Sequence, residues 1–263
     1  MYNFDVERPS TIADAVKALG REEAQTLSGG QTLIPTLKAR LAAPSVLVSL
    51  TGIDEMKGVC MDDAGRLCIG GGTTHATVAR EAAAHYPALA WLAGHIGDPA
   101  VRNRGTIGGS IANNDPSACY PAGVLGSGAT IVTNNREIAA DDYFKGMFET
   151  ALEEGEIVTE VKFPVPKAAH YQKILQPASR FPLVASFVAK FDDGVRVAIT
   201  GASNNGVFRW SEAEAALGGN FAASALDGLS LDGSNMISDL HGTGAYRAHL
   251  CAVMTRRAVS AIG

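Results

Sequence analysis

The sequence has no basic run that could hold nucleic acid. Its 22 Lys and Arg residues are outnumbered by 27 Asp and Glu residues, which gives a formal net charge of -5 over 263 residues. Because nucleic-acid binding depends on clustered cations that displace the counterions of phosphates, this composition argues against a nucleic-acid partner. Hydrophobic residues make up 46% of the chain and charged residues 19%, which is typical of a globular protein.

Recognisable metal centres and the common catalytic signatures are also missing. The four cysteines, Cys60, Cys68, Cys119 and Cys251, form no Cys-x-x-Cys pair and no Cys/His cluster with the spacing of a zinc or iron–sulfur site. The sequence has no His-Glu-x-x-His, Gly-x-Ser-x-Gly, Gly-Lys-Ser/Thr or Gly-x-Gly-x-x-Gly. We therefore predict free thiols, most of them in the core, and no metal ligand, and the absences remove the most easily recognised kinds of catalytic site.

Signals for secretion and membrane insertion are absent as well. The first nine residues have neither the basic start nor the apolar stretch of a signal peptide, and no apolar run approaches the ~18 residues of a membrane span. This pattern predicts a cytoplasmic protein with no membrane span.

The apolar spacing predicts a mixed α+β chain with a domain boundary at residue 166. Helices are expected at 12–19, from 33 to before Pro44, over most of 76–95, at 211–217 and at 244–261. Strands are expected at 24–27, 46–50, 67–69, 129–133, 157–163, 184–191 and 195–200, the last two antiparallel. In the strand 157–163, Ile157, Thr159, Val161 and Phe163 should share one face. The stretch 97–128 is rich in Gly, Asn, Asp and Pro, which favours shaped turns over regular structure.

Two glycine-rich turns carry the strongest chemical signal. Ser28 to Thr32 (Ser-Gly-Gly-Gln-Thr) joins an expected strand to an expected helix, where paired glycines let backbone N–H groups approach an anion such as a diphosphate. Residues 102–116 repeat that chemistry around Gly105, Gly108 and Gly109. Together the two turns favour a nucleotide cofactor over a single phosphate. Each turn alone is also compatible with an ordinary helix entry or a locally capped loop.

These segments resemble, in order and from end to end, the FAD-binding medium subunits of molybdenum hydroxylases, the family of aerobic carbon monoxide dehydrogenase and bacterial xanthine dehydrogenase. The resemblance rests on residues 8–16, 28–35, 102–109, 114–118, 149–156 and 246–250. It implies a two-lobed FAD-binding domain of the vanillyl-alcohol-oxidase (PCMH) type at residues 1–166 and a smaller C-terminal α+β domain at residues 167–263. It also implies a set of FAD-binding residues, namely Ser28, Gly29, Gly30, Gln31, Thr32, Thr106, Ile107, Gly108, Gly109, Ser110, Asn114, Asp115 and Phe181.

Several of the implied positions have simpler interpretations. Phe181 lies in segment 178–184, which resembles the family stretch that reaches the isoalloxazine ring, yet an aromatic residue beside Leu183 is also a natural core residue. His75 matches a segment near the cofactor, although an isolated histidine is commonly structural. Arg102 and Arg104 could face the cofactor or a partner, or could simply be solvated.

At Cys119 the sequence departs from the family pattern, because many relatives carry an aspartate there. A thiol accepts hydrogen bonds poorly, so the surroundings of the flavin, and hence its potential, could differ in this chain. The alternative is that Cys119 packs in the core.

The resemblance implies electron exit from a larger complex. A large subunit would carry molybdopterin, a small subunit would carry two [2Fe-2S] clusters, and the complex would be a heterohexamer. FAD on this chain would take electrons from the clusters and pass them to NAD, a quinone or oxygen. The sequence does not indicate the substrate, which the large subunit would select. Two other functions stay open: a stand-alone FAD oxidoreductase of the same fold, and a non-catalytic assembly module.

Overall fold

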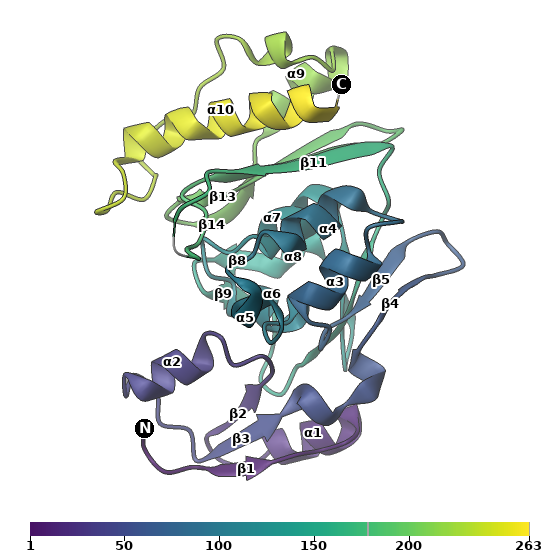
Figure 1. The fold of residues 1–263 in the computed structure, drawn as a ribbon, viewed down its shortest axis with the longest axis vertical. Helices are drawn as coiled ribbons and strands as arrows, with labels where there is room; N and C mark the ends of the chain where they lie inside the picture. Colours follow the sequence, from purple (N-terminus) through teal and green to yellow (C-terminus); the bar gives the residue numbers. More distant parts are fainter. Residues whose placement is uncertain (178, 263) are drawn as a thin grey trace.

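The structure of the chain, a computed structural model, describes residues 1–177 and 179–262. Ala178, the first residue of the segment 178–184, lies outside the described residues. Three parts follow one another along the long axis of the molecule (Figure 1): an N-terminal lobe (residues 1–56), a middle lobe (57–166) and a C-terminal part (167–262). Helices and strands are mixed throughout, so the predicted α+β class is confirmed.

The N-terminal lobe is built on a small parallel sheet. Its strands β1 (Asp5–Glu7), β3 (Val46–Ser49) and β2 (Ala24–Leu27) pair in the order β1-β3-β2. Parallel strands need crossover connections, and α1 (Ile12–Leu19) and α2 (Leu33–Lys38) provide them. Thr11 caps α1 as the sequence predicts, since its hydroxyl accepts a hydrogen bond from the amide of Asp14 at 3.1 Å. Two single turns of 3₁₀ helix, Leu50–Gly52 and Asp54–Met56, lead out of the lobe.

The middle lobe combines an antiparallel sheet with a layer of short helices. The sheet has the order β4 (Val59–Met61), β5 (Leu67–Gly70), β10 (Val158–Phe163), β6 (Thr130–Thr133) and β7 (Glu137–Ala139). Between β5 and β6 the chain forms α3 (His75–Glu81), α4 (Pro87–Gly94), α5 (Pro99–Arg102), α6 (Ile107–Asn113) and α7 (Tyr120–Ser127). After β7 come α8 (Ala140–Tyr143) and a hairpin of β8 (Phe144–Gly146) and β9 (Glu149–Thr150).

The C-terminal part is a four-stranded antiparallel sheet covered on both faces. Its strands run in order as β11 (Ala168–Lys173), β12 (Ala185–Lys190), β13 (Val195–Ser203) and β14 (Gly206–Arg209). One face packs on α4 and α7 of the middle lobe, so Tyr171 and Phe187 belong to the same core as that lobe. The long helix α10 (Gly244–Ile262) covers the other face, beside α9 (Ser211–Gly219) and a 3₁₀ turn at Ala223–Leu226 (Figure 1).

Two sequence predictions need correction. The stretch 97–128 is largely helical: Asp98 caps α5, Thr106 caps α6, and Pro99 and Pro121 stand in the first turns of α5 and α7. The prediction that Ile157 shares one face with the alternate residues of β10 is wrong, because a bulge lies between Val158 and Glu160. Ile157 consequently packs in the core of the N-terminal lobe, whereas Val158 packs in the core of the middle lobe.

Candidate functional site

The two glycine-rich turns meet in space. The hydroxyl oxygens of Ser28 and Thr106 are 2.8 Å apart, although 78 residues separate them in the chain. Behind this contact the backbones touch, because a Cβ atom on Gly29 would lie 2.2 Å from the carbonyl oxygen of Arg104. Only glycine permits that approach, so Gly29 joins the two lobes at this point.

A cavity of about 690 Å³ lies against both turns. This volume is within the roughly 300–1,000 Å³ typical of small-molecule and cofactor sites. Eleven of the thirteen residues expected to bind the cofactor line it, namely Ser28, Gly29, Gly30, Gln31, Thr32, Thr106, Gly108, Gly109, Ser110, Asp115 and Phe181. The C-terminal part closes the wall with Lys173 and the segment around Phe181. The cavity is therefore shared by all three parts of the chain.

Ile107 and Asn114 do not line this cavity. Ile107 is fully buried in the core of the middle lobe. Asn114 ends α6 in the left-handed conformation, with φ 43°, and its Nδ2 donates 2.8 Å hydrogen bonds to the carbonyl oxygens of Gly146 and Glu149. Its side chain thus fixes the β8–β9 hairpin, which is a structural task that the resemblance did not indicate.

The backbone amides of the two turns differ in what they can bind. In the second turn the amides of Ile107, Gly108, Gly109 and Ser110 donate to Thr73 O, Gly71 O, Thr106 Oγ1 and Thr106 O. In the first turn the amides of Gly29 to Thr32 donate to no acceptor in the part of the chain that the structure describes. Since backbone donors seldom go without a partner, the first turn offers its amides to a ligand or to water. The amides of the second turn, contrary to expectation, already have acceptors. This turn can therefore contribute only its shape and the Ser110 side chain to a ligand site.

His75 contributes a neutral imidazole to the cavity wall. Burial, followed by the charge of Arg102, lowers the pKa of His75 to about 4. Its Nδ1 is buried and has no hydrogen-bond partner among the described residues, which leaves a polar atom for a ligand. Arg102 itself donates to the carbonyl oxygens of Ile96 and Gly97, so it is a structural residue.

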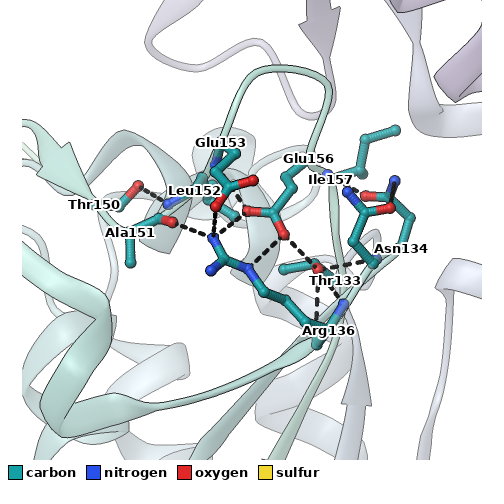
Figure 2. Close-up of polar contacts among 10 residues, drawn as sticks. Thr133, Asn134, Arg136, Thr150, Ala151, Leu152, Glu153, Glu156 and Ile157 are labelled. Carbon is teal, nitrogen blue, oxygen red and sulfur yellow. Dashed lines mark hydrogen bonds and ion pairs between the residues drawn. The ribbon is translucent and has the colours of Figure 1, made fainter.

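A buried carboxylate stabilises another part of the cavity wall. Figure 2 shows Glu156 held by Arg136, whose Nε and Nη2 lie 2.9 Å from the two carboxylate oxygens. The hydroxyl of Thr133 and the amide of Glu153 also donate to this carboxylate. The hydrogen bond from Arg136 is the main cause that lowers the pKa of Glu156. This network fixes the loop 150–157. Glu153 and Glu156 therefore stabilise the loop, and Glu156 forms part of the cavity wall.

The Phe181 ring lies at the cavity and not in the core. It is 44% exposed and makes an edge contact with His241, with ring centroids 5.7 Å apart. Two residues later, the carbonyl oxygen of Leu183 accepts a 2.7 Å hydrogen bond from buried Arg247, which also pairs with Asp239. Arg247 belongs to the segment 246–250 of the resemblance. It anchors the segment before β12 that carries Phe181.

A second cavity of about 610 Å³ adjoins the first turn. Arg8, Lys38 and Arg104 line it, with no acidic side chain beside them. Cations at this place favour a negatively charged ligand at the neighbouring turn. Arg104 lines this second cavity and forms no ion pair among the described residues.

Sequence reasoning missed the contribution of Lys173 and Arg180 to the cavity. Both come from the C-terminal part, where their position follows from the docking of the sheet and not from a local pattern. Cys119 lines the cavity and also belongs to the core of the middle lobe, so the position has both of the features that the sequence offered as alternatives. No group of three or more His, Cys, Asp or Glu side chains suited to a metal occurs among residues 1–177 and 179–262. Over the same residues, no helix is long and apolar enough to cross a bilayer.

Comparisons with known proteins agree with this geometry. Residues 2–166 match the family model described as the FAD binding domain in molybdopterin dehydrogenase. The chain is 35% identical to the carbon monoxide dehydrogenase medium chain of Afipia carboxidovorans, over 98% of this chain and 96% of the relative. It is 33% identical to the nicotine 6-hydroxylase medium subunit of Paenarthrobacter nicotinovorans, over 97% and 95%. Reconstituted CO dehydrogenase from Oligotropha carboxidovorans has a chain that matches the fold with a TM-score of 0.90 at 32% identity, covering 99% of this chain and 97% of that one.

Proposed function

Because the chain belongs to the family of FAD-binding domains of molybdopterin dehydrogenases, we propose that it passes electrons from the [2Fe-2S] clusters of a partner subunit to an external acceptor. The chain is an FAD-binding medium subunit of the molybdenum hydroxylase type, and it is part of an oxidoreductase. FAD, when bound, supplies the ability to take up electrons singly and release them in pairs. The residues of the chain bind it, orient it and exclude water.

One observation carries the assignment of the cofactor to the main cavity. The four amides of Gly29 to Thr32 have no acceptor among the described residues and lie on the wall of a cavity of suitable volume. A diphosphate supplies the acceptors that these donors lack. His75 adds a second unmatched polar atom, Nδ1, which a hydroxyl or a ring of the cofactor can satisfy. The residues present therefore fit FAD.

The expected site residues divide into four roles in this proposal. Ser28, Gly29, Gly30, Gln31 and Thr32 hold the diphosphate. Thr106, Gly108, Gly109, Ser110 and Asp115 shape the wall beside it. Phe181 shields the ring from solvent, as its half-exposed position at the cavity permits. Ile107 and Asn114 support these residues from behind.

The partners are proposed from the relatives. Relatives named as medium chains or medium subunits imply larger and smaller companions, and we assign to these a molybdopterin subunit and a [2Fe-2S] subunit in a cytoplasmic heterohexamer. The acceptor would be NAD, a quinone or oxygen. The substrate would be selected by the large subunit. No side chain of this chain acts as a general acid, base or nucleophile in this scheme.

An absorption spectrum of the purified native complex, followed by heat release of its flavin, tests the proposal. We expect one FAD per chain together with molybdenum and iron–sulfur subunits. A complex without flavin would point to an assembly module. A chain isolated alone whose flavin is bleached by a small substrate would point to a stand-alone oxidoreductase.

A further inference from the structure

A lysine from the C-terminal part reaches the wall of the main cavity. Lys173 is the last residue of β11, and its ammonium group donates to the carbonyl oxygen of His95, the residue that ends α4. The same Nζ lies 3.7 Å from the Sγ of Cys119, at the start of α7. Lys173 and Cys119 both line the cavity. The charge of Lys173 is thus held in place by two neutral groups, a carbonyl and a thiol.

No carboxylate cancels this charge within the described part of the chain. Lys173 forms no ion pair there. The acidic residues on the same cavity wall are Asp115 and Glu156. The carboxylate of Glu156 is paired with Arg136, and that of Asp115 accepts from the amide of Ser117, so neither lies within 4 Å of the Lys173 ammonium group. A partly buried ammonium group therefore lines the cavity with no carboxylate at ion-pair distance among the described residues.

We propose that Lys173 stabilises the reduced form of the flavin, and that the thiol of Cys119 sets the strength of this effect because it holds the ammonium group without neutralising it. The inference rests on the proposal that FAD occupies the main cavity. Two-electron reduction with uptake of one proton gives the flavin ring one negative charge. A fixed positive charge in a site with little water favours that form over the neutral oxidised form. Lys173 is a positioning and tuning residue in this scheme, and the electrons come from the partner's clusters.

The experiment is a potentiometric titration of FAD in the native complex, with flavin content measured first. Lys173→Met removes the charge and keeps the length of the side chain. Cys119→Asp keeps the contact and adds a neutralising carboxylate. Cys119→Ser is the matched control, because it replaces the thiol with another small uncharged group.

We expect Lys173→Met and Cys119→Asp to lower the midpoint potential, so that the ratio of reduced to oxidised flavin at a fixed ambient potential falls about tenfold, which is about 30 mV for a two-electron couple. Cys119→Ser should change this ratio by less than about threefold, or about 15 mV. Unchanged potentials in both charge variants, at full FAD content, would mean that Lys173 only ties β11 to α4, and would overturn the inference.

The design separates this inference from the proposed function. Absence of FAD from the wild-type complex would contradict the proposed function itself. If Lys173→Met failed to fold or to retain FAD, Cys119→Asp would still decide, because it leaves the lysine and its bond to His95 in place. Loss of FAD in Lys173→Met together with an unshifted potential in Cys119→Asp would assign Lys173 to flavin retention and overturn its tuning role.

Discussion

A Cβ atom on Gly29 would lie 2.2 Å from the carbonyl oxygen of Arg104 and 2.6 Å from the Cα of Gly105. Neither neighbour is the end of a flexible side chain, so the backbone itself would have to move. The close approach joins the N-terminal lobe to the middle lobe at the edge of the cavity. This packing gives Gly29 a role in folding that is separate from any role in ligand binding.

Gly29→Ala should therefore destabilise the protein. Forced overpacking commonly costs about 1–3 kcal/mol, and we expect the upper end of that range in the free energy of unfolding. Urea titration followed by circular dichroism measures it. Gly218→Ala is the control, because a Cβ there meets no atom within 4 Å. Equal stabilities of the two variants would contradict the close packing.

Gly109→Ala should separate binding from folding. Gly109 is exposed in the cavity, and its added Cβ would meet only the Thr106 hydroxyl at 3.0 Å and the Ser28 Cβ at 3.7 Å. We expect the unfolding free energy without flavin to change by less than about 1 kcal/mol, because helical propensity gains offset the contact. FAD affinity, measured by fluorescence titration, should fall at least tenfold. Full retention of FAD would mean that the flavin does not approach α6 here.

His75 should make stability depend on pH. Burial lowers the folded pKa of His75 to about 4, below the ordinary histidine value of 6.5, so the unfolded chain binds a proton that the folded chain excludes. The penalty is absent above pH 6.5, grows as pH falls and levels off near pH 4, at about 3 kcal/mol. His75→Phe should flatten the profile of unfolding free energy between pH 4 and 6.5. The same change at the exposed His249 is the control, and identical slopes in all three proteins would refute the assignment.

Arg247→Met should weaken the C-terminal part. Arg247 is 1% exposed and supports the carbonyl oxygens of Leu183 and Gly201 as well as the carboxylate of Asp239. Loss of one partner of a buried charged network costs about 3 kcal/mol. Thermal denaturation should show a clearly larger loss than Arg256→Met on the same helix, where the side chain is 35% exposed. A smaller loss than in that control would remove the anchoring role.

Local chemistry predicts the short elements well. Thr11 and Gly20 mark the two ends of α1, and β2 runs over the predicted residues 24–27. The glycine turns were predicted to act together, and the hydroxyl contact of Ser28 with Thr106 is consistent with that prediction. Caps, glycines and apolar spacing are properties of neighbouring residues, which is why a sequence reveals them.

Features set by distant contacts were missed. Gly123 and Gly126 look like helix breakers, yet they let α7 pack closely on the Phe187 ring of β12. The bulge in β10 and the reach of Lys173 to Cys119 likewise depend on how one layer docks on another. The hydrogen bonds that occupy the amides of α6 also depend on distant contacts, since the amide of Gly108 donates to the carbonyl oxygen of Gly71 across the lobe. Their partners lie dozens of residues away, and spacing along the chain does not encode them.

The walls of the main cavity come from different parts of the chain, and this affects how the parts of two relatives can be combined. Cys119 comes from the middle lobe and Lys173 from the C-terminal part, so a chimera that exchanges residues 167–263 between two relatives would combine the residue at position 119 of one parent with that at position 173 of the other. The charges at these two positions would then be mismatched in the hybrid, even if they were matched in each parent. The residues at positions 119 and 173 therefore have to be matched when the middle lobe and the C-terminal part come from different relatives.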